Sequence, residues 1–306
     1  MGKGKGYGKV ILINEHFVVY GVPSIVSAIE KATVATVERS EGSGWSLDDR
    51  RPATPGYKEE KLEQQRDSIE RVLKAAGVDL SKTAIKIILE GDLVAASGIG
   101  ASAASCVALA RALSEEFNLS LTDEQINQIA YEGEKAYHGN PSGVDNTAAT
   151  YGGLLWFIRG KPIERITIKR PVEIVMGNTG LVANTEAAVA GVRERRQKNP
   201  AKYERIFKEA EEVAYFARKA LVDYDLRTVG KLMDRNHELL KAIEVSCKEL
   251  DFLVELAREN GAYGAKMTGG GLGGNMVALT PGKELQEKVA RAIKKEGFEA
   301  LMTRIG

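Results

Sequence analysis

The chain has 306 residues, with 43 Lys and Arg against 42 Asp and Glu, and a formal net charge of +1. This length permits one large or two moderate domains with a full core, and the balanced charge argues against nucleic acid or an acidic membrane as a partner. With only two cysteines, Cys106 and Cys247, a disulfide framework is not expected. The sequence shows no signal peptide and no apolar run of roughly 18 residues, so we expect a cytoplasmic protein without a membrane segment.

Strands are expected up to about Glu38, and one of them is the apolar run from Val10 to Ile13. This run ends at Glu15 and His16, two polar side chains that a strand end can hold rigidly. A loop is expected over residues 42–57, followed by a helix over residues 59–76.

A stretch of small residues lies between an expected strand at residues 85–89 and an expected helix over residues 103–117. It consists of Ser97, Gly98, Ile99, Gly100, Ala101, Ser102 and Ala103. Free N–H groups and the positive dipole end at a helix start favour phosphate, and small side chains let the backbone approach an anion. Ser102 could cap the helix or bind a magnesium ion held by phosphates. Close helix packing explains the small residues equally well, and the chain has no Walker A sequence.

Two carboxylates follow within a short distance of each other. Thr122 and Gln125 form a capping box for an expected helix over residues 123–137, which places Glu134 near its end. Glycines and a proline over residues 139–143 then break the helix and present Asp145 in a compact turn. Such carboxylates suit metal binding and proton abstraction, although a helix end followed by a polar turn is an equally good interpretation.

The C-terminal half is expected to contain strands over residues 153–176 and then mostly helices, with start signals at Asn199-Pro200 and Asp225. A glycine-rich segment, residues 269–274, precedes a strand rather than a helix, so it does not fit a dinucleotide-binding motif. It is either a loop whose amides face an active site or a flexible hairpin. A helix over residues 282–296 and a final strand complete an α+β pattern.

Three segments in this order resemble the GHMP kinases: the small-residue stretch at residues 97–105, the carboxylate-bearing stretch at 134–146, and the glycine-rich segment at 266–274. Within that superfamily the chain resembles the mevalonate kinases, through the sequence GKVILINEHFVVYG at residues 8–21 and HGNPSGVDNT at 138–147. The chain departs from the family at Asn14, where a glycine is usual, at residues 95–97, and at Ala101, where a first serine is usual.

This resemblance implies a two-lobed fold with the active site between the lobes. The N-terminal mixed α/β lobe would span residues 1–165 and the C-terminal ferredoxin-like lobe residues 166–306. The expected reaction is ATP-dependent phosphorylation of the 5-hydroxyl of mevalonate. A kinase for another small alcohol, a kinase for a phosphorylated mevalonate derivative, and a sensor without turnover remain alternatives.

The resemblance also implies residue roles. Asp145 would accept the proton of the substrate hydroxyl, with the positive charge of Lys9 beside it, and Glu134 and Ser102 would hold Mg²⁺ against the ATP phosphates. The loops 97–103 and Gly269, Gly270 and Gly271 would bind ATP. Glu15, His16, Asp145, Tyr151 and Thr179 would contact mevalonate, although ordinary turn bonding explains Thr179 as well. A homodimer is one assembly that we consider.

Overall fold

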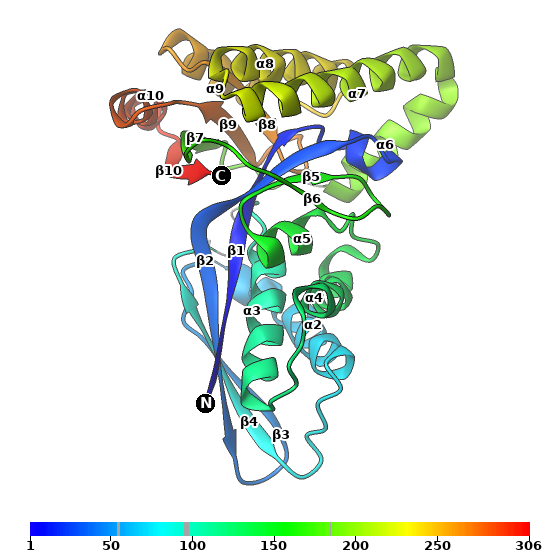
Figure 1. The fold of residues 1–306 in the computed structure, drawn as a ribbon, viewed down its shortest axis with the longest axis vertical. Helices are drawn as coiled ribbons and strands as arrows, with labels where there is room; N and C mark the ends of the chain where they lie inside the picture. The colour runs from blue at the N-terminus through cyan, green and yellow to red at the C-terminus, as the bar shows by residue number, and fades with distance from the viewer. Residues whose placement is uncertain (54–55, 95–97, 184) are drawn as a thin grey trace. The chain divides into compact units, whose positions relative to one another are not determined.

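The computed structural model describes all residues except 54–55, 95–97 and 184 (Figure 1). The described chain forms two compact units. The first contains residues 1–9 and 30–152, and the second contains residues 10–29 and 153–306. Strands β1 (Gly2–Ile13) and β2 (Ser24–Ser40) therefore contribute to both units. Helices and strands do not alternate strictly, which confirms the α+β class. The described helices include none with the length and apolar character needed to cross a membrane.

The first unit combines a sheet with a group of helices. Strand β4 (Ala84–Gly91) pairs antiparallel with β2 and parallel with β3 (Gly44–Asp49). The helices are α1 (Tyr57–Glu60), α2 (Leu62–Ala75), α3 (Ala101–Glu116), α4 (Asp123–His138) and α5 (Val144–Tyr151). Most residues of α3 are buried, so its small side chains serve close packing as well as any ligand.

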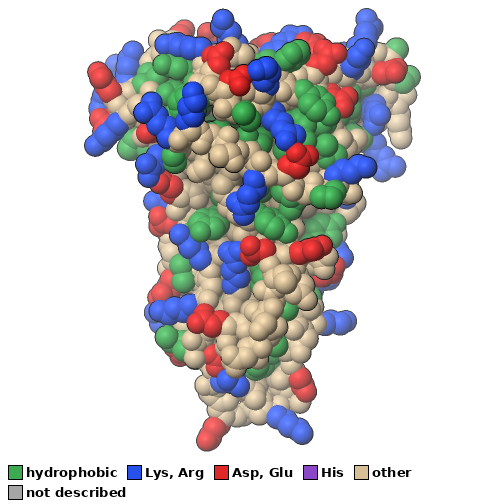
Figure 2. Space-filling view, in the orientation of Figure 1, with side chains coloured by type: hydrophobic (Ala, Val, Ile, Leu, Met, Phe, Trp, Pro, Cys, Tyr) green, Lys and Arg blue, Asp and Glu red, His purple; other side chains and the backbone are tan. Residues whose placement is uncertain are grey.

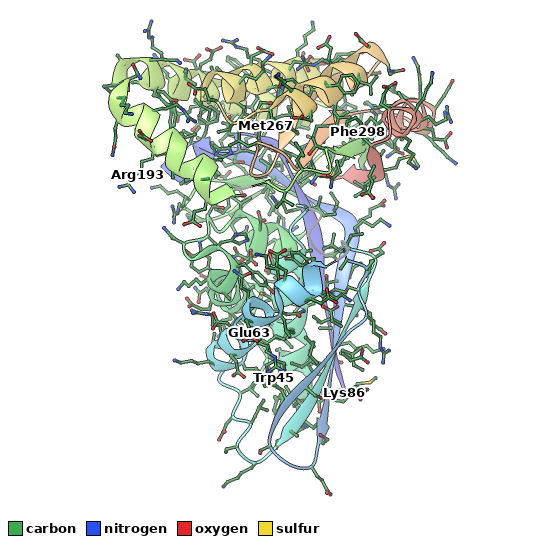
Figure 3. The ribbon with its side chains drawn as sticks, turned by 180° about the vertical axis from the view of Figure 1, so that it is seen from behind. Trp45, Glu63, Lys86, Arg193, Met267 and Phe298 are labelled. Atoms are coloured by element: carbon green, nitrogen blue, oxygen red, sulfur yellow. The ribbon has the colours of Figure 1, made fainter. Side chains whose placement is uncertain are left out.

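The prediction of a loop over residues 42–57 is wrong for residues 44–49, which form β3. This strand pairs with β4 alone among the described strands, and its residues are only half-buried or exposed. Its sequence therefore lacks the apolar alternation that marks a strand packed on a core. Trp45, labelled in Figure 3, donates a hydrogen bond to Glu70 of α2.

Strand β1 lies directly against the backbone of α3 through alternate glycines. A Cβ atom on Gly2, Gly4 or Gly6 would lie 2.2, 2.1 or 2.1 Å from the carbonyl oxygen of Ala112, Ala108 or Ala104, respectively. Residues two apart share one face of a strand, and residues four apart share one face of a helix. Because both segments have this spacing, the face of β1 that carries only glycines can contact one side of α3.

The second unit contains an antiparallel four-stranded sheet in the order β10-β7-β9-β8 (Figure 1). The strands are β7 (Val172–Asn178), β8 (Gly264–Thr268), β9 (Asn275–Leu279) and β10 (Glu299–Ile305). Strand β5 (Leu154–Phe157) pairs with the start of β2 and with β6 (Glu164–Ile166). A short 3₁₀ helix, η1 (Phe17–Tyr20), follows β1.

The described residues of the second unit also form five helices. They are α6 (Thr185–Lys198), α7 (Pro200–Asp223), α8 (Leu226–Ala242), α9 (Lys248–Glu259) and α10 (Lys283–Lys295). Both predicted start signals are confirmed, because α7 begins at Pro200 and Asp225 caps α8 by accepting from the amide of Thr228. Positive and negative side chains are interspersed on the face seen in Figure 2, in keeping with the balanced composition.

Candidate active site

Lys9 and Asp145 form an ion pair in the first unit. Lys9 is buried near the middle of β1, and its Nζ lies 3.1 Å from Asp145 Oδ1. Its amide donates to the carbonyl of Ile99 at 2.9 Å, which joins the strand to the small-residue loop. The structure corrects the expected position of Asp145, which lies in the first turn of α5 rather than in the turn before it. That helix is too short to show periodicity in the sequence.

The start of α3 lies beside this ion pair. A Cβ on Gly100 would lie 2.8 Å from Lys9 Cγ and 3.8 Å from Asp145 Oδ2, so only glycine allows this approach. Gly100 is the N-cap, with φ 79°, so Ser102 is not the N-cap, and no side chain among the described residues caps the helix. The uncapped first-turn amides of α3 can therefore bind an anion next to Asp145. Of the predicted loop, Ser97 lies outside the described residues.

Glu134 supplies a buried carboxylate near the same place. The predicted capping box of Thr122 and Gln125 is confirmed, and Glu134 lies just before the last turn of α4 with 1% of its surface exposed. Burial, and then the charge of Asp145, raise the pKa of Glu134 to about 8, while a hydrogen bond with Ser102 opposes this. Its Oε1 is buried without a hydrogen-bond partner in the described chain.

These features fit a divalent cation. Mg²⁺ takes one or two carboxylates and completes its coordination with water and phosphate oxygens. An unpaired oxygen on Glu134, next to the hydroxyl of Ser102, is a ligand pair of that kind. The part of the chain that the structure describes contains no cluster of three or more His, Cys, Asp or Glu residues suited to a metal.

A pocket next to Ser102 was missed by the sequence analysis. It is lined by Asp49, Arg51, Tyr57, Lys58, Lys61, Gln65, Ala101, Ser102 and Tyr137. Arg51 is buried, forms a bidentate pair with Asp49, and donates to Ser105 on α3. In the sequence, Arg51 belongs to a run of four charged residues that is typical of a solvated surface, so only the fold reveals that it is buried.

The second unit holds Glu15 and His16. Glu15 is fully buried, and both of its carboxylate oxygens accept hydrogen bonds from the ammonium group of Lys266 on β8. Met267, the next residue, is labelled in Figure 3. Lys266 was also missed, because a lysine in a strand next to a glycine-rich loop is ordinarily exposed. A buried pair of this kind is strongly destabilised when either partner is removed.

His16 is buried with φ 60° and hydrogen bonds through Nε2 to the carbonyl oxygen of Gly270 at 2.9 Å. Since a carbonyl only accepts, Nε2 carries the proton and Nδ1 is left as an acceptor. This Nδ1 is buried and has no hydrogen-bond partner within the described ranges. Burial lowers the pKa of His16 to about 4, so the ring is neutral at pH 7.

Asn14, the departure from the family's usual glycine, has φ 73°. Glycine adopts this conformation freely, and asparagine is among the few other residues that tolerate it. The Asn14 side chain donates to the carbonyl oxygens of Pro23 and Ala210, and accepts from Asn236 at 2.7 Å. The substitution therefore keeps the backbone conformation and adds buried hydrogen bonds within the second unit.

The remaining predicted residues have varied surroundings. The glycine-rich segment joins β8 to β9, which confirms the strand–loop–strand prediction, and Gly269 and Gly271 have φ values of 86° and 74°. Thr179 donates to the carbonyl of Gly274 at 2.9 Å and accepts from the amide of Leu181, so its hydroxyl takes part in turn bonding. Tyr151 is the last residue of α5 and is half-buried.

Comparisons with known proteins agree with this picture. The GHMP kinases N terminal domain matches residues 66–153, and the GHMP kinases C terminal domain matches residues 217–299. The chain is 34% identical to mevalonate kinase from Pyrococcus abyssi, over 97% of this chain and 93% of that protein.

Solved structures show the same relationship. The crystal structure of L. major mevalonate kinase in complex with R-mevalonate matches with a TM-score of 0.95 and 41% identity, covering 100% of this chain and 96% of that one. A phosphomevalonate kinase from Streptococcus pneumoniae matches with a TM-score of 0.77 and 15% identity, covering 100% of both chains, and shares the fold alone. The two-lobed fold expected from the sequence is confirmed by these matches.

Proposed function

This chain belongs to the mevalonate kinases, a family of the GHMP kinases, and on that premise we propose that it transfers the terminal phosphoryl group of ATP to the 5-hydroxyl of mevalonate. The ion pair of Lys9 and Asp145 beside the uncapped start of α3 is the observation that carries this function. Identities of 34% and 41% to mevalonate kinases, against 15% to a phosphomevalonate kinase, favour the unphosphorylated substrate.

In the proposed reaction, the substrate hydroxyl oxygen attacks the γ-phosphorus of ATP. A new O–P bond forms, the bond from the γ-phosphorus to the bridging oxygen breaks, and ADP leaves. Asp145 accepts the hydroxyl proton. Lys9 supplies positive charge beside Asp145 and the transferring group, which matters because phosphoryl transfer depends mainly on positioning and charge neutralisation.

Glu134 and Ser102 would hold Mg²⁺. Their support is the unpaired, buried Oε1 of Glu134 and its neighbouring hydroxyl. When bound, the ion would neutralise negative charge on the ATP phosphates. The four groups expected of a working kinase, Lys9, Ser102, Glu134 and Asp145, are all present, which argues against a sensor without turnover.

The nucleotide and mevalonate would be bound by main-chain and side-chain groups from the predicted segments. We assign the ATP phosphates to the backbone of residues 98–103, while a role for residues 269–271 stays a prediction from the sequence. We assign mevalonate to His16, whose unpaired Nδ1 can accept a hydrogen bond from a hydroxyl, with Thr179 and Tyr151 as further contacts. Glu15 would act indirectly, because Lys266 occupies its carboxylate. A cytoplasmic location and a homodimer remain predictions from the sequence.

The test is the Asp145→Asn variant. Removal of a general base lowers kcat by about 10²–10⁴-fold, while ATP binding measured by calorimetry should not change. Asp67→Asn is the matched control, since Asp67 is an exposed residue of α2 in the same unit whose ion pair is to Arg71. An Asp145→Asn enzyme that keeps more than about half of the wild-type kcat would remove Asp145 from the reaction.

A further inference from the structure

Asp145 lies on helix α5, which by itself does not fix the direction in which the Asp145 side chain points. Helix α5 has eight residues, and its N-cap, Gly143, has φ 85° and offers no side chain to cap the first turn. Helices this short are marginal without tertiary contacts. The direction in which Asp145 points must therefore be set by groups outside α5.

Asn127 of α4 holds the two residues that follow Asp145. The side-chain amide of Asn146 donates to Asn127 Oδ1 at 2.6 Å and to the Asn127 carbonyl at 3.2 Å. Asn127 Nδ2 donates in turn to Thr147 Oγ1 at 3.3 Å. Asn146 and Thr147 are both buried. The other amide atom of Asn146, Oδ1, has no hydrogen-bond partner in the described residues, so the orientation of this amide depends on Asn127.

Asn127 also shares a helix face with Glu134. Positions 127, 131 and 134 follow the i, i+4, i+7 spacing that places side chains on one side of a helix. Tyr131, between them, donates to the carbonyl of Pro141 at 3.2 Å in the turn that leads to α5. One face of α4 thus contacts the chain on both sides of Asp145 and also carries the proposed metal ligand.

We propose that Asn127 is a positioning residue for phosphoryl transfer: by holding Asn146 and Thr147, it orients the Asp145 carboxylate. This rests on the proposed function, in which Asp145 is the general base. The mechanism is geometric, because a displacement of about 1 Å in a reacting group can cost about 10²-fold in rate. Asn127 itself contacts neither substrate in this proposal.

The experiment compares Asn127→Ala with Gln128→Ala, a control at the next, exposed position of the same helix. We expect Asn127→Ala to lower kcat by about 10–100-fold. The KM values for ATP and mevalonate should stay within about twofold of wild type, since the substrate contacts remain. Gln128→Ala should have the wild-type kcat and the wild-type KM values for ATP and mevalonate. The proposal is overturned if the Asn127→Ala enzyme keeps the wild-type kcat, or if the substitution mainly raises a KM value instead of lowering kcat.

A double-variant cycle separates positioning from a general structural effect. If Asn127 acts through Asp145, adding Asn127→Ala to Asp145→Asn should lower kcat no further. An additive loss overturns the proposal even if Asp145 is the base, whereas an active Asp145→Asn enzyme contradicts the proposed function itself. If Asn127→Ala does not fold, Asn146→Ala removes the same hydrogen bond from the other side, and the same outcomes decide.

Discussion

The contact between β1 and α3 predicts that Gly6→Ala impairs both stability and catalysis. A Cβ at Gly6 would lie 2.1 Å from the carbonyl oxygen of Ala104, whereas ordinary contacts begin at 3.4 Å. The backbone of β1 or of α3 must therefore move away by the difference between these distances, about 1.3 Å. The φ of Gly6 is not in the left-handed region, so the added methyl acts through this clash alone. Overpacking of this kind costs about 1–3 kcal/mol of unfolding free energy.

Catalysis should suffer because Ala104 lies two residues after Ser102 on the same helix. A displacement near 1 Å at α3 should lower kcat by at least about tenfold. Chemical denaturation and steady-state kinetics measure the two effects, with Lys3→Ala, an exposed neighbour on β1, as the control. If Gly6→Ala unfolds at the wild-type denaturant concentration and keeps its kcat, the backbones are not in the close contact described above.

Three further predictions concern the proposed site. Glu134→Gln and Ser102→Ala should each raise the Mg²⁺ concentration needed for half-maximal rate. If the magnesium titration curves of both variants superimpose on the wild-type curve, both residues have a structural role only. His16→Asn, chosen because asparagine tolerates the φ of 60° at this position, should raise the KM for mevalonate more than the KM for ATP, and an equal rise would exclude His16 from the mevalonate site. Burial lowers the pKa of His16 from its ordinary value of 6.5 to about 4, so the unfolded state takes up a proton at a higher pH than the folded state does. The free energy of unfolding should therefore fall as pH drops from 6.5 to 4. Denaturation at pH 7 and pH 5 should show a smaller fall for His16→Asn, with a remainder from His237, whose pKa burial also lowers to about 4; an unchanged fall contradicts a buried, neutral His16.

Local signals in the sequence predicted much of the fold. The capping box of Thr122 and Gln125, the start of α7 at Pro200 and the glycine-rich hairpin each depend on a few neighbouring residues, and each is present in the structure. Such features follow from the hydrogen-bonding and conformational preferences of single residues. They are the kind of feature that a single sequence can reveal.

The residues that were missed depend on contacts between distant parts of the chain. Lys266 and Glu15 are 251 positions apart, and nothing near either one indicates that both are buried. Arg51 is buried against Asp49 and Ser105 because β3 forms where a loop was expected. Burial of a charge is decided by tertiary packing and by the presence of a partner, and neither is local information.

The sharing of β1 and β2 between the two units bears on how the protein is made. Residues 10–29 pack with residues 153–306, yet the 123 residues from 30 to 152 are synthesised between them. The early strands of the second unit therefore remain without their packing partners until most of the chain has left the ribosome. Ile25 and Val26 are among the apolar side chains that these strands carry. Long-range pairing of this kind slows folding and exposes apolar segments to aggregation. For the same reason, a fragment beginning at Gly153 would lack part of its own core, so expressing the two units separately should fail.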